Sequence, residues 1–392
     1  VMLDLCAAPG GKSTLCRSAL PEGSLLVANE VMRNRSQVLA ENLIKWGHPE
    51  VVVTNNDPAD FTELIHLFDV ILTDVPCSGE GMFRKEADAV TMWSPENVAL
   101  CAARQGEILE EAAKMLRAGG YLVYSTCTFA PAENEGAVMR FLSRHPEFEV
   151  VRSAEDAVIE SRERGLLDSG RPEWEEEYGQ FPARIAKQVQ DTYRVFPHHC
   201  DGEGHFAALL HKREEVGEVP LSSKEGKKKS RKPEKPSGGK GKPAPVSVAV
   251  KLLEEFCREV MGGIPSWVGE TVPCLFGDKL YLVPKALCGE SDPTEALKGI
   301  RVLRAGLCAG TVVGLDKGRG RLEPDHALAL CAGAGIRTLT VNYDSAVAYL
   351  RGETLPCELR GWHTVSYCGL PLGWGKASDG VMKNHYPKGL RR

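Results

Sequence analysis

The sequence predicts an α/β fold with a doubly wound, mostly parallel sheet over residues 1–150. Short runs rich in Val, Ile and Leu alternate there with longer amphipathic stretches, the pattern of consecutive strand–helix–strand units. Such units connect through right-handed crossovers, so we expect their strands to lie parallel in one sheet. The expected strands are VMLDL (1–5), SLLVANE (24–30), EVVVTNND (50–57), FDVILTD (68–74) and GYLVYSTC (120–127).

Two stretches between these strands have helical periodicity, residues 33–47 and 96–116. The second is followed by RAGG at 117–120, which predicts a glycine cap at the end of the helix, just before the last strand of the series. Residues 193–212 regain strand character after a polar region, and we expect them to complete the sheet.

Changes in composition divide the chain into three parts. Residues 1–211 form the first domain, and residues 212–245 are so rich in Lys, Pro, Gly and Ser that we expect a disordered linker. Residues 246–392 combine many glycines with short apolar runs, which predicts a separate small domain with a mixed β-barrel.

The linker concentrates positive charge. Between Lys224 and Lys242 nine Lys or Arg stand against two Glu, although the whole chain has a formal charge of −5. A basic segment on an acidic body suits a polyanionic partner, and it equally suits a linker kept in solution by its lysines.

The overall composition is that of a globular protein, with 43% hydrophobic and 26% charged residues. No run of about 18 apolar residues occurs, so we expect no membrane span. The 13 cysteines are an odd number without C-x-x-C pairs, which argues against a disulfide framework or a zinc ribbon. We therefore expect a monomer in a reducing cytoplasm, without metal.

The ends of the expected strands carry the candidate binding residues, because ligands of doubly wound sheets bind beyond the carboxyl ends of the strands. A loop of small residues, CAAPGGK, follows the first strand and lets backbone N–H groups approach a ligand. It lacks the Walker A spacing. Its residues are Cys6, Ala7, Ala8, Pro9, Gly10, Gly11 and Lys12.

Acidic residues end the next three strands, Glu30, Asp57 and Asp74. Glu30 is placed to accept the hydroxyls of a ribose, and Asp57 to meet an amino group of a purine. Each acid alone is more often a solvated strand end, but three in register favour a nucleoside-type cofactor. Because G-x-G-x-x-G is missing, S-adenosyl-L-methionine is favoured over a dinucleotide.

Two cysteines follow the fourth and fifth strands, Cys77 in DVPCSG and Cys127 in STCT. A lone cysteine is usually a small buried apolar residue, but two thiols at adjacent strand ends beside Asp74 predict a reactive site. A thiolate that adds to carbon 6 of a pyrimidine makes carbon 5 nucleophilic enough to accept a methyl group. These residues alone do not tell which of the two thiols attacks.

Four stretches resemble the RNA 5-methylcytosine methyltransferases of the Nol1/Nop2/Sun family. They are DLCAAPGGKST (4–14), DVPCSGEGMFRK (74–85), YSTCTFAPAENE (124–135) and RVFPHH (194–199) with GEGHFAALL (202–210). The spacing of these stretches, the linker and the end WGKASDGVMKNHYPKGLRR (374–392) resemble the bacterial, RsmF-like branch, which methylates 16S ribosomal RNA. The resemblance implies a Rossmann-like methyltransferase domain, S-adenosylmethionine as cofactor, and a PUA-like RNA-binding domain at the carboxyl end.

The resemblance also implies roles for single residues. It makes Cys127 the nucleophile and gives Cys77 the release of the methylated RNA. It places Lys12 near the reacting groups and Asp74 against the methyl donor and the target base. It assigns Glu30 to the ribose and Asp57 to the adenine.

Family members have a further region ahead of the first strand, whereas Val1 already lies in that strand. We therefore expect residues 1–392 to be part of a longer chain and to be weakly active or inactive alone.

Other readings of the chain remain open from the sequence. The substrate is expected to be ribosomal RNA or the small ribosomal subunit, with transfer RNA as the alternative. A non-catalytic RNA-binding assembly factor is a further alternative, which the intact site residues argue against. Trp374 and His385, among lysines, fit either a base-stacking surface or the packing of the terminal domain. Core packing is the default expectation for Cys16 and Cys101, and also for the thiol of Cys6 in the loop.

Overall fold

A computed structural model describes residues 1–61, 64–214, 246–289, 291–314, 320–333 and 335–391. Its largest sheet has the order β12-β3-β2-β1-β4-β5-β9-β8-β7, with β6 paired to β9. The run from β3 to β5 is parallel, as predicted, and the order 3-2-1-4-5 is doubly wound. The parallel strands are β1 (Met2–Asp4), β2 (Leu26–Asn29), β3 (Val51–Thr54), β4 (Phe68–Asp74) and β5 (Leu116–Thr126).

Antiparallel strands extend the β5 side of this sheet, which confirms that residues 193–212 complete it. They are β6 (Phe148–Val150), β7 (Asp168–Ser169), β8 (Tyr193–Val195) and β9 (His205–Lys212). The helices of this part are α1 (Gly11–Ala19), α2 (Arg33–Trp46), α3 (Ala87–Met92), α4 (Pro95–Met115), α5 (Glu135–Arg144), α6 (Asp156–Glu163) and α7 (Ala183–Val189).

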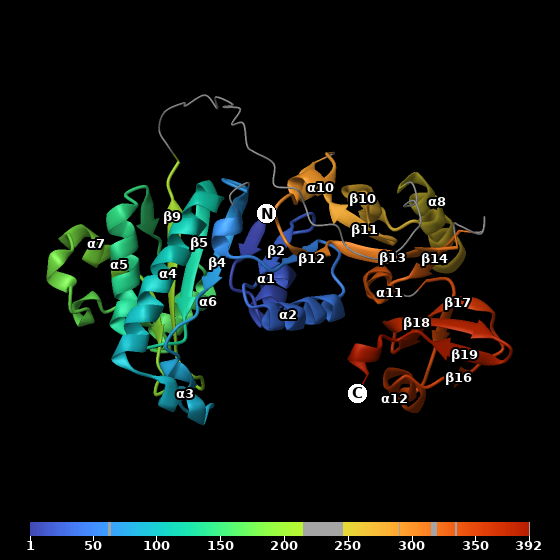
Figure 1. Cartoon of the computed structure of the whole chain (residues 1–392). Coiled ribbons are helices and arrows are strands. Elements are labelled where there is room, and N and C mark those ends of the chain that lie inside the picture. Colours follow the sequence, from blue (N-terminus) through green and yellow to red (C-terminus); the bar gives the residue numbers. More distant parts are fainter. Residues whose placement is uncertain (62–63, 215–245, 290, 315–319, 334, 392) are drawn as a thin grey trace.

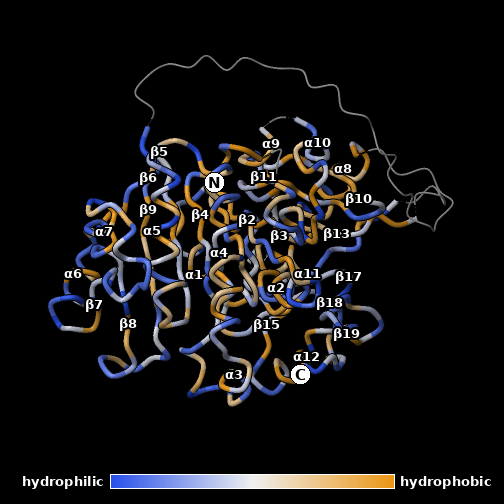
Figure 2. The backbone as a smooth tube through the Cα atoms, turned by 60° about the vertical axis from the view of Figure 1, so that its left-hand side comes forward, coloured by the Kyte–Doolittle hydropathy of each residue, from blue (hydrophilic) through white to orange (hydrophobic). Residues whose placement is uncertain are grey.

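Helices cover both faces of the sheet because its central strands bury side chains on both sides (Figure 1). On β2, for example, Val27 faces the core shared with α4 and α5, whereas Leu26 and Ala28 face the core shared with α2. Figure 2 shows the result as apolar colouring gathered along the central strands and the inner sides of the helices.

The glycine cap predicted at 117–120 is wrong. Helix α4 ends at Met115 and β5 begins at the next residue, Leu116. The pairing with β4 shifts where these glycines lie, and Gly119 has φ +75° within the strand. A Cβ on Gly120 would lie 2.9 Å from the carbonyl oxygen of Asp69, so the glycines serve a close approach of two strands.

The carboxyl-terminal part contributes two further sheets. The first has the order β10-β11-β13-β14 and the second β15-β17-β18-β19-β16. Their strands are β10 (Thr271–Phe276), β11 (Lys279–Pro284), β13 (Leu307–Val313), β14 (Arg321–Pro324), β15 (Thr338–Thr340), β16 (Leu355–Pro356), β17 (Gly361–Tyr367), β18 (Leu370–Ser378) and β19 (Val381–Asn384). The helices are α8 (Val246–Phe256), α9 (Lys285–Cys288), α10 (Pro293–Ala296), α11 (His326–Ala332) and α12 (Tyr343–Arg351).

One strand of this part joins the large sheet, so the two halves of the chain are in direct contact (Figure 1). Strand β12 (Val302–Ala305) pairs antiparallel with β3. The guanidinium of Arg304 is fully buried there and donates to the carbonyl oxygen of Leu43 at 2.7 Å. Most of the expected linker lies outside the described residues.

Candidate active site

The candidate site lies where the strand order reverses, between β1 and β4. Strands β4 and β5 pair in parallel, and Asp74 lies opposite Ser125 at their carboxyl ends. The backbone N–H of Val75 still donates to the carbonyl oxygen of Ser125 at 3.0 Å beyond the strands. Because this pairing keeps the ends of β4 and β5 side by side, the turns that carry Cys77 and Cys127 lie next to each other.

The two thiols are in contact, with 3.2 Å between the Sγ atoms of Cys77 and Cys127. A hydrogen bond from the Cys77 thiol stabilises the thiolate of Cys127 and so lowers the pKa of Cys127. Burial and the charge of Asp74 oppose this effect, and the charge of Lys12 adds to it. The same contact, together with burial, raises the pKa of Cys77. The pKa of Cys127 is thus lowered and that of Cys77 raised, while the Sγ–Sγ contact itself allows either thiol to donate.

Asp74 links the thiols to the cofactor loop. Its Oδ2 accepts from Lys12 Nζ at 2.7 Å, and its Oδ1 accepts from Ser125 Oγ at 2.8 Å. The imidazole Nε2 of His205 lies 3.9 Å from the same Oδ1. Asp74 and Lys12, predicted from two different strand ends, thus form one polar cluster.

Two side chains of α2 hold the cofactor loop through hydrogen bonds to its backbone. Arg35 donates to the carbonyl oxygen of Ala8 at 2.7 Å, and Asn42 donates to that of Pro9 at 2.8 Å. Gly10 has φ +110°, a conformation that side chains rarely adopt, and helix α1 begins at the next residue. Lys12, in the first turn of α1, thereby reaches Asp74.

A cavity of about 1150 Å³ lies along the carboxyl ends of the strands. The predicted residues among those lining it are Cys6, Ala8, Glu30, Asp57, Asp74, Cys77 and Cys127. Among the other residues of the cofactor loop, Ala7 and Gly10 are buried, and Pro9 and Gly11 are exposed. Lys12 lines a second cavity.

The carboxylates that line the first cavity suit the functional groups of S-adenosylmethionine. Glu30 is 3% exposed, and its Oε1 accepts from the backbone N–H of Met32 at 2.9 Å, which fixes the carboxylate at the cavity wall. Asp57 lies on the same wall and is exposed. Carboxylates at these two positions suit hydroxyl and amino groups of a nucleoside, and Asp74 adds negative charge that suits a sulfonium.

The second cavity, of about 460 Å³, adjoins the first at Cys127. It shares Asp74, Met82 and Cys127 with the first cavity, and Cys77 lines only the first. Its other lining residues are Lys12, Val195, Cys200, Asp201, Gly202, Glu203, Gly204 and His205. Cys127 is therefore placed where two ligands, one in each cavity, would meet.

A buried network that the sequence analysis missed supports the turn of Cys77. The amide of Gln105 donates to the carbonyl oxygen of Pro76 at 3.0 Å and to Glu133 at 2.7 Å. Glu133 in turn accepts from the backbone N–H of Ser78 at 3.0 Å, so both neighbours of Cys77 are held. Burial raises the pKa of Glu133. Gln105 lies in the middle of α4, and no local pattern distinguishes it there.

The turns of the two cysteines are also tied to each other. Glu80 Oε2 accepts from Thr128 Oγ1 at 3.1 Å and from the backbone N–H of Phe129 at 2.8 Å. The N–H of Gly81 donates to the carbonyl oxygen of Cys127 at 2.8 Å. Only glycine fits at position 81, because a Cβ there would lie 2.5 Å from that carbonyl oxygen.

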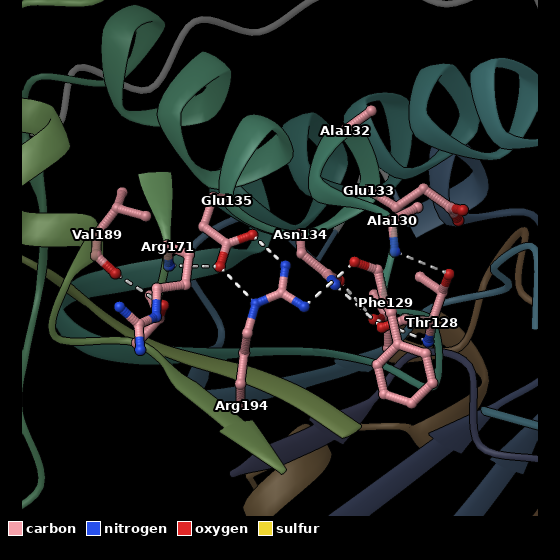
Figure 3. Close-up of polar contacts among 12 residues, drawn as sticks. Thr128, Phe129, Ala130, Ala132, Glu133, Asn134, Glu135, Arg171, Val189 and Arg194 are labelled. Carbon is pink, nitrogen blue, oxygen red and sulfur yellow. Dashed lines mark hydrogen bonds and ion pairs between the residues drawn. The ribbon is translucent and has the colours of Figure 1, made fainter. Parts of the chain in front are cut away.

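A buried ion pair anchors the chain that follows Cys127 (Figure 3). Arg194 binds Glu135 through two hydrogen bonds, Nε–Oε1 at 2.7 Å and Nη2–Oε2 at 2.5 Å. The third guanidinium nitrogen donates to the carbonyl oxygen of Phe129 at 3.2 Å. Arg194 thereby connects β8 to α5 and to the loop two residues beyond the nucleophile candidate.

The remaining candidates are mostly structural. Trp374 is 1% exposed and its indole N–H donates to the carbonyl oxygen of Asp325, so its packing explanation holds. Cys101 is buried, and Cys16 is half-buried against the core of α2. His385 is exposed and packs against the ring of Trp362.

Neither a metal site nor a membrane-spanning helix occurs within the described residues. No cluster of three or more His, Cys, Asp or Glu is arranged to hold a metal ion there. None of the helices that the structure describes is both long and apolar enough to cross a bilayer.

Similarity to known proteins covers most of this architecture. Residues 1–211 match the family described as 16S rRNA methyltransferase RsmB/F. The chain belongs to this family. Residues 255–331 match the first C-terminal domain of RsmF rRNA methyltransferases, and residues 337–392 match the RsmF PUA domain. The fold is thus that of an S-adenosylmethionine-dependent methyltransferase with a PUA-type domain.

Individual relatives carry the same description. Ribosomal RNA small subunit methyltransferase F of Klebsiella pneumoniae is 31% identical over 398 residues, which span 100% of this chain and 73% of the relative. The enzyme of that name from Shewanella loihica is 30% identical, over 100% of this chain and 72% of the relative. Among solved structures, NSun6 from Pyrococcus horikoshii with SFG is 28% identical with a TM-score of 0.42, over 55% of this chain and 48% of that chain.

Proposed function

We propose that this methyltransferase modifies carbon 5 of a cytosine in 16S ribosomal RNA, through a covalent bond between Cys127 and carbon 6 of the base. The pair of thiols carries the proposal, because one lies 3.2 Å from the other at the junction of two cavities. The names of the relatives and the match of residues 337–392 to a PUA domain support ribosomal RNA as the substrate.

Covalent catalysis answers a chemical need of this reaction. Carbon 5 of cytosine is a poor nucleophile, and addition of a thiolate at carbon 6 turns it into the nucleophilic end of an enamine. The thiolate must form near neutral pH, where a free cysteine is mostly protonated. The hydrogen bond from Cys77 and the charge of Lys12 both favour the thiolate of Cys127.

The first cavity suits the methyl donor. S-adenosylmethionine bound there supplies an electrophilic methyl group on a sulfonium. Glu30 and Asp57 would hold its ribose and adenine, and Cys6 and Ala8 of the cofactor loop line the same cavity. Asp74 lies where the cavities meet, and its carboxyl group would hydrogen-bond to N3 of the base, which stabilises the adduct.

The second cavity suits the base. A cytosine stacked in an RNA helix cannot reach a thiol at the end of a sheet, so the target must be single-stranded or flipped out. Lys12, Asp74 and Cys127 all line this cavity. Once carbon 5 is methylated, the bond from Cys127 to carbon 6 must break, and Cys77 is placed to donate a hydrogen bond to the departing thiolate.

Trapping the adduct tests the roles of the two thiols. With S-adenosylmethionine and unmethylated 16S RNA, Cys77→Ala is expected to accumulate an RNA–protein adduct that survives denaturing electrophoresis. Cys127→Ala is expected to give neither adduct nor product. Cys368→Ala, at an exposed cysteine outside both cavities, is the matched control.

Each alternative has its own outcome. The opposite behaviour of the two variants would exchange the roles of the thiols, and the absence of an adduct in every variant would refute covalent catalysis. Bisulfite mapping of RNA from a strain that lacks the gene tests the substrate. Loss of a 5-methylcytosine from transfer RNA, with ribosomal RNA unchanged, would contradict the proposal.

A further inference from the structure

His205 begins strand β9 and lies beside the nucleophile candidate. In the antiparallel pairing of β5 with β9, Ser125 lies opposite Ala207 and Thr126 opposite Phe206. Cys127 follows Thr126 and His205 precedes Phe206, so both lie at the same end of this strand pair, and both line the second cavity. The loop after β5 and the loop before β9 both pack closely against Gly81. A Cβ on Gly81 would lie 2.5 Å from the carbonyl oxygen of Cys127 and 2.8 Å from that of Glu203.

The proposed reaction needs a base on one particular side of the cytosine. Once carbon 5 has received the methyl group it carries a methyl and a hydrogen, and the hydrogen must leave as a proton before the double bond can re-form. The methyl group arrives from the first cavity, so the hydrogen is displaced toward the opposite face. A base for this step therefore belongs to the second cavity and not to the first.

Most titratable groups of the second cavity are already engaged. Lys12 and Asp74 pair with each other at 2.7 Å, and Ser125 occupies the other oxygen of Asp74. Oε2 of Glu203 has no hydrogen-bond partner among the described residues, but it lies within ion-pair distance, 3.7 Å, of the guanidinium of Arg84. Asp201 is exposed at the rim of the cavity.

The thiol of Cys200 points to the backbone, with Sγ at 3.7 Å from the carbonyl oxygen of Phe196. His205 differs from these groups. It lines only the second cavity, its side chain is 31% exposed, and its 3.9 Å approach to Asp74 is too long for a direct hydrogen bond.

The surroundings keep this imidazole ready to accept a proton. Burial lowers the pKa of His205, the charge of Lys12 on α1 lowers it further, and Asp74 on β4 opposes both. The carboxyl groups of Asp201 and Glu203 on the preceding loop also face the cavity. A histidine with a lowered pKa is neutral at neutral pH, which is the form that a general base requires.

We propose that His205 is the general base that removes the proton from carbon 5 of the methylated adduct. The electrons of the C–H bond form the double bond between carbons 5 and 6. The bond between carbon 6 and Cys127 breaks, and its electron pair remains on Sγ, where the thiol of Cys77 donates a hydrogen bond. The inference rests on the proposed function. It assigns two parts of product release to two residues: His205 accepts the proton, and Cys77 stabilises the departing thiolate of Cys127.

The test follows the hydrogen itself. RNA with tritium at carbon 5 of cytosine releases tritium to water only when this proton leaves. His205→Gln keeps a polar side chain of similar size but cannot act as the base. It is expected to form the methylated adduct and to slow tritium release by about 10²–10⁴-fold. His211→Gln, on the same strand but outside both cavities, is the control and should release tritium at the wild-type rate.

A second variant separates chemistry from folding. In His205→Ala, added imidazole is expected to restore tritium release, because the site is open to solvent. The wild-type release rate should fall as the pH is lowered through the pKa of His205, and the rate of His205→Gln should lack this dependence. Circular dichroism and thermal unfolding check that both variants are folded.

Three results would overturn the role of His205: wild-type release by His205→Gln, loss of adduct formation in a folded His205→Gln protein, or no rescue by imidazole. Failure of the proposed function looks different, because the wild-type protein itself would then methylate RNA without releasing tritium, or Cys77→Ala would trap no adduct through Cys127.

Discussion

Removing the guanidinium of Arg194 is expected to destabilise the protein strongly, because it strands a buried carboxylate. Arg194 is 1% exposed and Glu135 0% (Figure 3). In Arg194→Met the two hydrogen bonds to Glu135 and the one to Phe129 are lost. The carboxylate of Glu135 then keeps the backbone N–H of Arg171, at 2.7 Å, as its remaining donor among these contacts.

The expected magnitude follows from the burial of the pair. Breaking a fully buried ion pair by removing one partner costs about 3–5 kcal/mol of unfolding free energy. In the double variant Arg194→Met/Glu135→Gln no charge remains buried, and the cost should fall to about 1–3 kcal/mol, typical of lost hydrogen bonds. The control is Arg164→Met, which removes an exposed i,i+4 pair with Glu160 and should cost less than about 0.5 kcal/mol.

Equilibrium unfolding in urea, followed by circular dichroism, gives these differences by linear extrapolation. A cost below about 1 kcal/mol for Arg194→Met would refute the reasoning. So would a double variant no more stable than the single one, because the burial of an unpaired charge would then not be the cause.

Three further variants probe the site. Gly81→Ala should lose stability and methyl transfer, because its Cβ would lie 2.5 Å from the carbonyl oxygen of Cys127, whereas Gly179→Ala, with open space around it, should be neutral in both assays. Cys77→Ala should raise the pKa of Cys127 by removing its hydrogen-bond donor, so iodoacetamide should alkylate Cys127 more slowly at a given pH; an unchanged profile would contradict this. Burial raises the pKa of Asp4 to about 7, so the folded state binds the proton more tightly than the unfolded state and stability should fall as the pH rises from about 4 to 7. Asp4→Asn should flatten that pH dependence in urea unfolding, and a slope equal to that of the wild type would count against it.

The site could be located from the sequence because its residues follow strands. Asp74 and Cys77 lie next to a run of buried apolar residues, and so does Cys127. In a parallel sheet, residues at the carboxyl ends of neighbouring strands must share an edge. The pairing of β4 with β5 confirms that expectation. The roles assigned to these residues remain predictions.

The supports of the site could not be located in this way. Gln105 lies in mid-helix and Glu133 at the end of a short 3-10 helix, and only packing brings them to the turn of Cys77. His205 was noted only as part of a matching motif, although it lines the second cavity together with Cys127. Such partners are far apart in sequence, so no local pattern records them.

The helix end at Met115 shows the limit of local rules. Two glycines after a helix usually cap it, but here they allow β5 to approach β4, and the tertiary contact decides their conformation. The pairing of β12 with β3 is likewise a tertiary contact between residues far apart in the sequence. It adds a strand from the carboxyl-terminal part to the edge of the large sheet.

By itself the sequence determined the alternation of strands and helices, the parallel sheet, and the acids and thiols at its carboxyl edge, because hydrophobic periodicity and strand ends are local features. Only the tertiary structure decided that the two thiols lie 3.2 Å apart and that Lys12 and Asp74 pair beside them. Those contacts join residues from separate strand ends, and only the folded sheet brings such residues together.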